Sequence, residues 1–219
     1  MSKTRETHSL LIDIAIEQFG VKGLDGTSTR AIAAGAGTVI SSITYHFGGK
    51  EGLYLAAADR VASGVAQMIA SLVEDGMKAE ADGCGVPTAR ASLHNMFQAI
   101  TEVFTRQDAE AYTRFLIREQ AEPTEAFQRI YRGAMAGILT RIAHLIQVVS
   151  NGKLDTKAAR LQALMLVGQV IIFRAARATV VTTTGWTDIG INEKVLVQSM
   201  IVDNLDTILD HLEHVNGLT

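Results

Sequence analysis

The sequence is poor in cysteine, proline and aromatic residues, and it carries little net charge. Its one cysteine, Cys84, excludes an internal disulfide framework and a thiol cluster for structural zinc, so we expect the reducing cytoplasm as its location. Two prolines among 219 residues leave long stretches free to form helices. A net charge of −3 excludes bulk electrostatic attraction to nucleic acid. Residues 1–60 contain six basic and six acidic side chains, so DNA contacts must depend on local placement.

We also find no export signal and no long uncharged apolar run. Residues 1–6 carry charges of both signs before an amphipathic segment begins. The longest apolar stretch, Leu161–Ile172, is interrupted by glutamine or glycine at positions 162, 168 and 169. We therefore interpret it as a buried helix and expect no contact with a membrane.

What the sequence has in abundance is helical periodicity, because apolar residues recur three and four positions apart along most of the chain. The predicted fold is all-α. We expect helices at about Thr7–Val21, two short ones between Thr27 and His46, and then Glu51–Glu80, Thr88–Thr105, Asp108–Gln120, Thr124–Val149, Thr156–Thr182 and Asn192–Val215. We assign residues 1–54 to an N-terminal three-helix DNA-binding domain of the helix-turn-helix type. Residues 55–219 would form a C-terminal helical domain for ligand binding and dimerisation.

The helix-turn-helix is predicted from the segment between Thr27 and Phe47. Such a motif needs a small residue where its helices approach and a residue that tolerates positive φ in the turn. Ala33 and Gly37 supply these four positions apart, and Ile32 and Ile43 can pack the pair onto the first helix. This spacing also occurs in plain helical hairpins, which remain an alternative on this feature alone.

Polar side chains on the outside of this segment are candidates for DNA contact. Ser41, Ser42, Thr44 and Tyr45 fall on or near the outer face of the second short helix, where hydroxyl groups can bond to base edges or phosphates. Arg30 can contact a guanine or a phosphate, and Lys50 follows the Gly-Gly break at a place suited to a backbone phosphate.

The run ITYHFGGKEGLY, residues 43–54, resembles the signature that follows the recognition helix in TetR/AcrR-family regulators. Phe19, Gly23 and the Thr29-Arg30-x-Ile-Ala pattern extend the resemblance over residues 7–55. It implies packing roles for Phe47 and Leu53. The DNA-contacting positions that it implies are Thr29, Arg30, Ser41, Ser42, Thr44, Tyr45 and Lys50. His46 either contacts a phosphate or caps and packs the helix end.

The sequence departs from the family pattern just after Gly37, where Thr38 and Val39 replace an apolar residue followed by a capping serine or threonine. Either the recognition helix begins one residue early with Thr38 as its cap, or it begins without a cap.

The C-terminal half carries a second resemblance. Arg118-Glu119-Gln120 with Pro123-Thr124, and Phe173-Arg174 followed by residues 184–187, resemble the YbiH/CecR-type branch of the family. This resemblance implies a regulator of efflux or antibiotic-tolerance genes.

The segment from Leu161 to Val181 is apolar around its whole circumference. It lies either wholly in the core of one subunit or between that core and a second subunit, together with the last helix. We favour a homodimer through the last two helices, which would match a palindromic double-stranded DNA operator.

A small apolar or amphipathic inducer is the expected signal. The residues that we single out for its site combine aromatic and polar side chains: His94, Phe97, Gln98, Phe104, Phe115, Arg118, Gln169 and Phe173. The competing interpretation is that the aromatic residues fill the core and that Arg118 and Glu119 form surface ion pairs.

No sequence motif of a hydrolase, a nucleotide-binding enzyme or a metalloprotease occurs. His211 and His214 are too few for a zinc site. We therefore expect a protein without catalytic residues, metal or cofactor. The alternative function is a helical ligand carrier or enzyme that retains the helix-turn-helix only as a packing unit.

Overall fold

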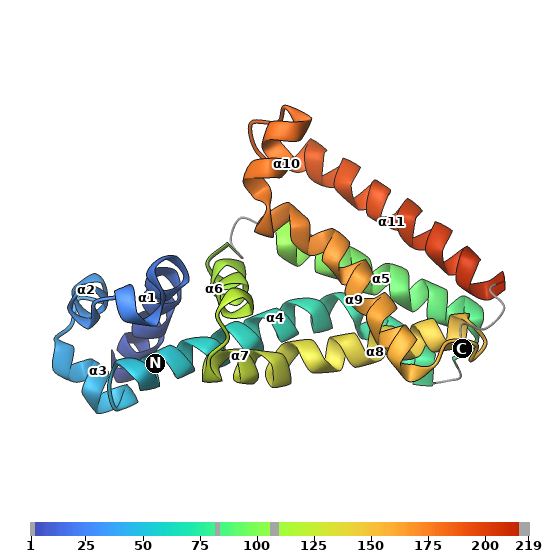
Figure 1. Cartoon of the computed structure of the whole chain (residues 1–219). Helices are drawn as coiled ribbons and strands as arrows, with labels where there is room; N and C mark the ends of the chain where they lie inside the picture. Colours follow the sequence, from blue (N-terminus) through green and yellow to red (C-terminus); the bar gives the residue numbers. More distant parts are fainter. Residues whose placement is uncertain (1–2, 82–83, 106–109, 215–219) are drawn as a thin grey trace. The chain divides into compact units, whose positions relative to one another are not determined.

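The computed structural model describes residues 3–81, 84–105 and 110–214, which form helices joined by short turns, with no strand among them (Figure 1). The predicted all-helical fold is confirmed. By compactness the chain divides into two units, residues 1–66 with 108–135 and residues 67–107 with 136–219. The boundary after residue 54 separates the predicted DNA-binding domain from the predicted ligand-binding and dimerisation domain, and it stays a prediction.

The first unit contains α1 (Lys3–Gly26), α2 (Thr29–Gly35), α3 (Ile40–Phe47), the start of α4 (Lys50–Ala81), α6 (Glu110–Ala121), α7 (Glu125–Ile130) and a π-helical turn (Tyr131–Met135). Helix α1 packs beside α6, which follows it much later in the chain (Figure 1). Aromatic rings join these helices: Tyr54 meets Phe19 edge-on at 4.8 Å between ring centres and Phe115 at 5.0 Å. The core of this unit therefore depends on both of its sequence segments.

Helix α1 is interrupted where the sequence predicts its end. Gly23 has φ +71°, a backbone conformation that side-chain-bearing residues rarely adopt, and the Arg118 guanidinium occupies the space of a Cβ there. The helix begins at Lys3, earlier than the expected Thr7.

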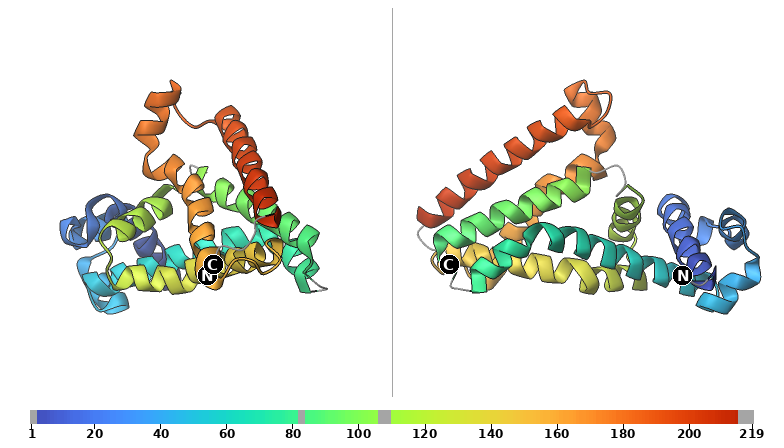
Figure 2. Two further views of the ribbon diagram at one scale, coloured as in Figure 1. Left: turned by 45° about the vertical axis from the view of Figure 1, so that its right-hand side comes forward. Right: turned by 180° about the vertical axis from the view of Figure 1, so that it is seen from behind.

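The second unit contains the rest of α4, α5 (Val86–Thr105), α8 (Ala136–Val149), α9 (Thr156–Ala175), α10 (Arg177–Thr184) and α11 (Ile191–His214). Helices α8 and α9 pack side by side, and α5 contacts both (Figure 2). Their buried side chains, among them Leu93, Phe97, Ile142, Leu145 and Val170, form a mainly aliphatic core.

Helix α9 begins as expected but ends early. The Asp155 carboxylate accepts the N–H of Ala158 at 2.7 Å and caps its first turn. The predicted helix Thr156–Thr182 is wrong at its C-terminal end, because Ala176, at φ −115° and ψ 35°, breaks it into α9 and α10. Between α8 and α9 the chain turns at Asn151 and Gly152, both of which have positive φ. The predicted helix ends at Asp108 and Val215 lie outside the described residues.

Much of the apolar surface of α9 is exposed in the single chain. Ala159, Ala163, Leu166 and Val170 face the core, whereas Leu161, Leu164, Met165 and Ile172 are half exposed or more. Of the two alternatives from the sequence, the one that buries this helix wholly in the core of one subunit is therefore wrong. By length and composition α9 could also cross a membrane, a property that it shares with core helices of soluble proteins.

Candidate nucleic-acid interface

Helices α2 and α3 form the predicted helix-turn-helix, and their inner faces pack as expected. Ile32, Ala33 and Ile43 are buried. Gly37 has φ +60°, which allows the chain to reverse between the helices. The turn is closed by the N–H of Thr38, which donates to the carbonyl of Ala33 at 2.9 Å. This packing fixes which side of α3 faces outward.

The outward side of α3 carries hydroxyl groups. Ser41, Thr44 and Tyr45 are exposed, and Tyr45 is 83% accessible. Ser42 is half-buried, with its hydroxyl 2.8 Å from that of Thr38. Tyrosine and short hydroxyl side chains on an exposed helix can donate to and accept from base edges and phosphates.

The beginning of α3 has no side-chain cap. Val39 occupies the cap position, and Thr38 bonds to the Ser42 hydroxyl instead of to a backbone N–H. Of the two alternatives from the sequence, the uncapped helix is therefore the one observed. Relative to serine or aspartate at the cap, this arrangement costs about 0.5 to 2 kcal/mol of stability. Val39 is 65% exposed and Ile40 43% exposed. The sequence marked Val39 only as a departure from the family pattern and did not mark Ile40.

Helix α2 places Arg30 on its exposed side and Thr29 in a half-buried position at its first residue. Ser28 caps this helix by accepting the N–H of Ala31. The Thr27 side chain is buried, and its hydroxyl donates to the carbonyl of Gly23 at 2.7 Å.

His46 and Lys50 follow the outward face of α3. The His46 ring is half-buried and meets the rings of Tyr45 and His8 edge-on, at 5.0 and 5.6 Å between centres. The Lys50 ammonium donates to the carbonyl of Asp25 at 3.2 Å, in an exposed position. The packing of His46 agrees with its role at the helix end, while a phosphate contact from either residue stays a prediction.

Next to His46 lies an open hollow of about 420 Å³ lined by Thr4, Arg5, His8, Ser9, His46 and Arg60. Burial first, and then the charges of His46 and Arg60, lower the pKa of His8. The His8 ring stacks on Phe47, with 4.7 Å between centres. Arg60 is held by Asp13 at 3.2 Å and by Ser9 at 3.0 Å. Sequence reasoning missed this basic cluster, because its members come from three helices.

Elsewhere in the first unit, a buried carboxylate links α4 to α6 and α7. Glu119 is 1% exposed and accepts hydrogen bonds from the Tyr54 hydroxyl, from the N–H and hydroxyl of Thr124 at 3.1 and 2.8 Å, and from the N–H of Phe127 at 2.9 Å. Burial, followed by the bond to Glu119, raises the pKa of Tyr54. The expected surface ion pair is thus wrong for Glu119. For Arg118 the expected surface ion pair is observed, because its guanidinium lies 3.9 Å from the carboxylate of the exposed Glu122.

The residues predicted for a ligand site fall in both units. Phe115 and Arg118 belong to the first unit, where Phe115 packs against Tyr54. In the second unit Phe97 and Phe104 are buried, Gln169 and Phe173 are half-buried, and Gln98 is exposed. His94 lies 2.9 Å from the Asp206 carboxylate.

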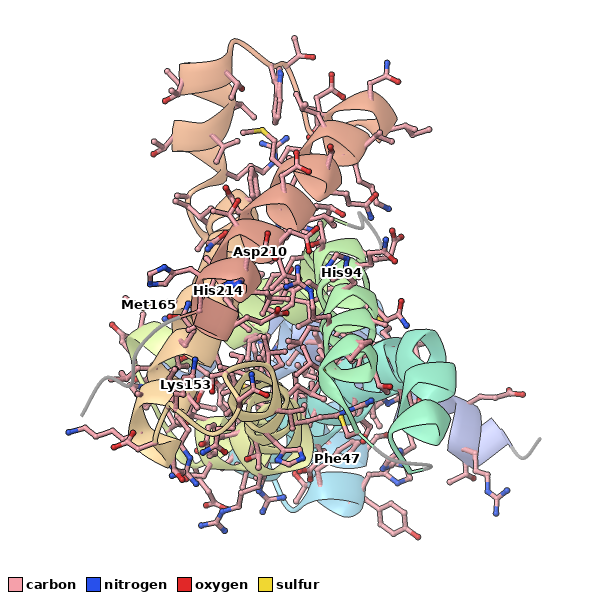
Figure 3. The ribbon with its side chains drawn as sticks, turned by 90° about the vertical axis from the view of Figure 1, so that its right-hand side faces the viewer. Phe47, His94, Lys153, Met165, Asp210 and His214 are labelled. Carbon is pink, nitrogen blue, oxygen red and sulfur yellow. The ribbon has the colours of Figure 1, made fainter. Side chains whose placement is uncertain are left out.

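His94 is part of a polar cluster between α5 and α11, labelled at His94 and Asp210 in Figure 3. The Arg90 guanidinium contacts the carboxylates of Asp206, Asp210 and Glu213 at 3.0, 2.7 and 2.8 Å. Burial acts to raise the pKa of Asp206, but His94 and Arg90 outweigh it and hold that pKa below its ordinary value. This cluster attaches α11 to the core of the second unit.

Helices α9 and α11 each present exposed apolar side chains. On α9, Met165 is 67% accessible (Figure 3), and Leu161, Leu164 and Ile172 accompany it. On α11 the exposed residues are Ile191, Val195, Leu196 and Met200. Apolar residues gathered on two helices are unusual for a surface that meets only water.

Comparison with known proteins gives two family matches. The profile described as "Bacterial regulatory proteins, tetR family" matches residues 11–57. The profile "HTH-type transcriptional dual regulator CecR, C-terminal domain" matches residues 89–212.

Individual relatives agree with these matches. The chain is 28% identical over 214 residues to the HTH-type transcriptional dual regulator CecR of Shigella flexneri, covering 96% of this chain and 94% of that protein. A shorter match of 47% identity over 55 residues covers 25% of this chain and 26% of the HTH-type transcriptional regulatory protein RaaS of Mycobacterium tuberculosis.

AibR and a regulator from Mesorhizobium loti are among the solved structures that share the fold. AibR, in complex with isovaleryl coenzyme A and operator DNA, has a TM-score of 0.67 at 16% identity and covers 91% of this chain and 97% of its own. A putative TetR-family regulator from Mesorhizobium loti has a TM-score of 0.63 at 19% identity and covers 96% of this chain and 98% of its own.

Proposed function

Because the chain belongs to the TetR family of regulatory proteins, in the branch defined by the CecR C-terminal domain, we propose that it represses transcription from a palindromic operator and releases this DNA when it binds a small inducer. The chain is a DNA-binding transcriptional regulator and not an enzyme. The family assignment decides against the alternative of an enzyme or carrier that keeps the motif for packing alone. Action on DNA agrees with the expected cytoplasmic location.

The observation that carries the proposal is the outward face of α3. Its hydroxyl groups are exposed while Ile43 anchors the opposite side in the core, so the helix can enter a major groove without unfolding. Thr29, Arg30, Ser41, Ser42, Thr44, Tyr45, His46 and Lys50 are the proposed DNA-contacting residues. The relative from Shigella is named a dual regulator, so transcription from each bound promoter is to be measured for both repression and activation.

We expect Tyr45→Ala and Arg30→Ala each to weaken operator binding by about 5- to 150-fold, because a lost base or phosphate contact is worth roughly 1 to 3 kcal/mol. The measurement is an electrophoretic mobility shift on DNA upstream of the gene. Tyr131→Ala, at another exposed tyrosine outside the helix-turn-helix, is the matched control and keeps the wild-type affinity. Equal affinity of the wild type for scrambled DNA at every salt concentration would contradict the proposal.

A dimer is the second part of the proposal, supported by the exposed apolar residues of α9 and α11. A two-fold pair would cover them and present two copies of α3 at the separation of successive major grooves, about 34 to 36 Å.

We expect the double substitution Leu164→Glu and Met165→Glu to convert dimers into monomers at micromolar concentration, because two carboxylates would lose their hydration in an apolar interface. Sedimentation equilibrium measures the mass against the 23.5 kDa of one chain. Val21→Glu, at an exposed apolar position on α1, is the control and leaves the dimer intact. A wild-type protein that sediments as a single chain in the presence of operator DNA would refute this part.

The inducer is proposed to be apolar or amphipathic. The fold accommodates such a ligand in AibR, whose structure holds isovaleryl coenzyme A. The candidate residues are His94, Phe97, Gln98, Phe104, Phe115, Arg118, Gln169 and Phe173, and the proposed regulon is efflux or antibiotic-tolerance genes, by resemblance to the CecR branch. The test is a thermal-shift screen of apolar compounds, each hit then being added to the preformed operator complex, from which a true inducer releases the DNA.

A further inference from the structure

Two aliphatic side chains stand at the first turn of α3, where the groove-facing surface would otherwise be polar. Val39 occupies the cap position and Ile40 is the first helical residue. Both side chains are exposed, Val39 more than Ile40. In a helix-turn-helix the N-terminal end of the second helix comes nearest to the base edges.

Neither residue is explained by stability. A β-branched aliphatic side chain cannot cap the helix, and an exposed one gains little from burial. The neighbouring hydroxyl that could have capped α3, that of Thr38, is paired with Ser42 at 2.8 Å. A local arrangement that sacrifices stability without a packing gain is expected at functional positions.

The major groove offers one apolar feature to such side chains, the C5-methyl group of thymine. The other groups on its floor are hydrogen-bond donors and acceptors, which aliphatic side chains leave unpaired. A protein partner is a weaker explanation, because two side chains supply far less than the roughly 800 Å² per partner of a stable protein interface.

We propose that Val39 and Ile40 contact thymine methyl groups and so specify thymine at one or two positions in each half-site of the operator. This inference rests on the proposed function, and it identifies the part of the recognition surface that discriminates by apolar contact. The hydroxyls of Ser41, Thr44 and Tyr45 then supply the polar contacts beside it.

The test begins with an operator selected from a random DNA pool by the wild-type protein. Each thymine of the selected half-site is replaced in turn by deoxyuridine, which removes the methyl group and keeps the hydrogen-bonding pattern. We expect one or two replacements to weaken binding roughly fourfold, the value of one buried methyl-sized group, with the remaining replacements neutral.

Substitutions in the protein assign the effect to its residues. Combining the protein and DNA substitutions gives a double-mutant cycle. At the position that its side chain contacts in the wild type, each of Val39→Ala and Ile40→Ala should bind the thymine and deoxyuridine forms with equal affinity. Val39→Ser should also lose the discrimination while melting at a higher temperature, because serine supplies the missing cap, so misfolding cannot explain its result. Val21→Ala keeps the wild-type ratio.

The two hypotheses fail in different ways. If the wild type selects no sequence, the proposed function is wrong and the thymine contact falls with it. If it selects an operator but every deoxyuridine form binds as well as thymine, or if both alanine variants keep the full discrimination, the thymine contact is wrong and the regulator stands.

Discussion

Replacing Glu119 with alanine is expected to lower the free energy of unfolding of the first unit by about 3 to 5 kcal/mol. The carboxylate is buried and accepts from the N–H groups of Thr124 and Phe127 as well as from the Tyr54 hydroxyl. Each buried donor left without an acceptor costs roughly 1 to 3 kcal/mol. Urea unfolding, followed by the far-ultraviolet circular dichroism of the helices, measures the change in the free energy of unfolding.

Three further variants separate this hydrogen-bond network from charge in general. Glu122→Ala removes an exposed carboxylate three positions away and should change the free energy of unfolding by less than about 0.5 kcal/mol. Glu119→Gln keeps the shape and one acceptor oxygen, so its loss should be smaller than that of Glu119→Ala. Tyr54→Phe should cost about 1.5 to 3 kcal/mol, the value of a hydrogen bond to a charged group. If Glu119→Ala unfolds like Glu122→Ala, the buried carboxylate has no structural role.

A single methyl group on Gly52 is expected to weaken both folding and operator binding. A Cβ at this position in the first turn of α4 would overlap the carbonyl oxygen of Phe47 and lie 2.9 Å from its carbonyl carbon. These are backbone atoms, so the end of α3 must move away from α4. We expect Gly52→Ala to lose about 1 to 3 kcal/mol of stability, as overpacked sites do, and to weaken operator binding at least about tenfold.

The opposite result is expected at Gly137, in α8, where an added Cβ meets nothing within 4 Å. Gly137→Ala should stabilise the protein by about 0.4 to 1 kcal/mol, because alanine loses less chain entropy on folding. Thermal melting and the mobility shift measure both variants. Similar melting temperatures for Gly52→Ala and Gly137→Ala would show that the backbone at Phe47 moves away from the added methyl group without a loss of stability.

The sequence was sufficient to predict most of the helices and the helix-turn-helix, because both depend on local patterns. The spacing of Ile32, Gly37 and Ile43 determined the inner face of the motif, and the structure buries both isoleucines. The exposed positions of Arg30, Ser41, Thr44 and Tyr45 follow from the same periodicity. Their contacts with DNA remain predictions.

Features that depend on distant segments could not be predicted in this way. Glutamate is a residue type that usually lies at the surface. Only the approach of α4 and α7 gives the Glu119 carboxylate its buried hydrogen-bond partners. The break between α9 and α10 at Ala176 occurs without a glycine or proline from which the sequence could have predicted it. The open side of α9 likewise depends on which neighbours the fold supplies, since its apolar residues surround the helix axis.

The pairing of α1 with α6, and of Tyr54 with Glu119 across 65 positions, has a consequence for synthesis. Ribosomes add about 5 to 20 residues per second, so the N-terminal helices emerge several seconds before the segment that covers Phe19 and Tyr54. During this interval those aromatic faces are open to chaperones or to neighbouring nascent chains. The half of the protein that is translated first therefore completes its core only after more than half of the chain has been made.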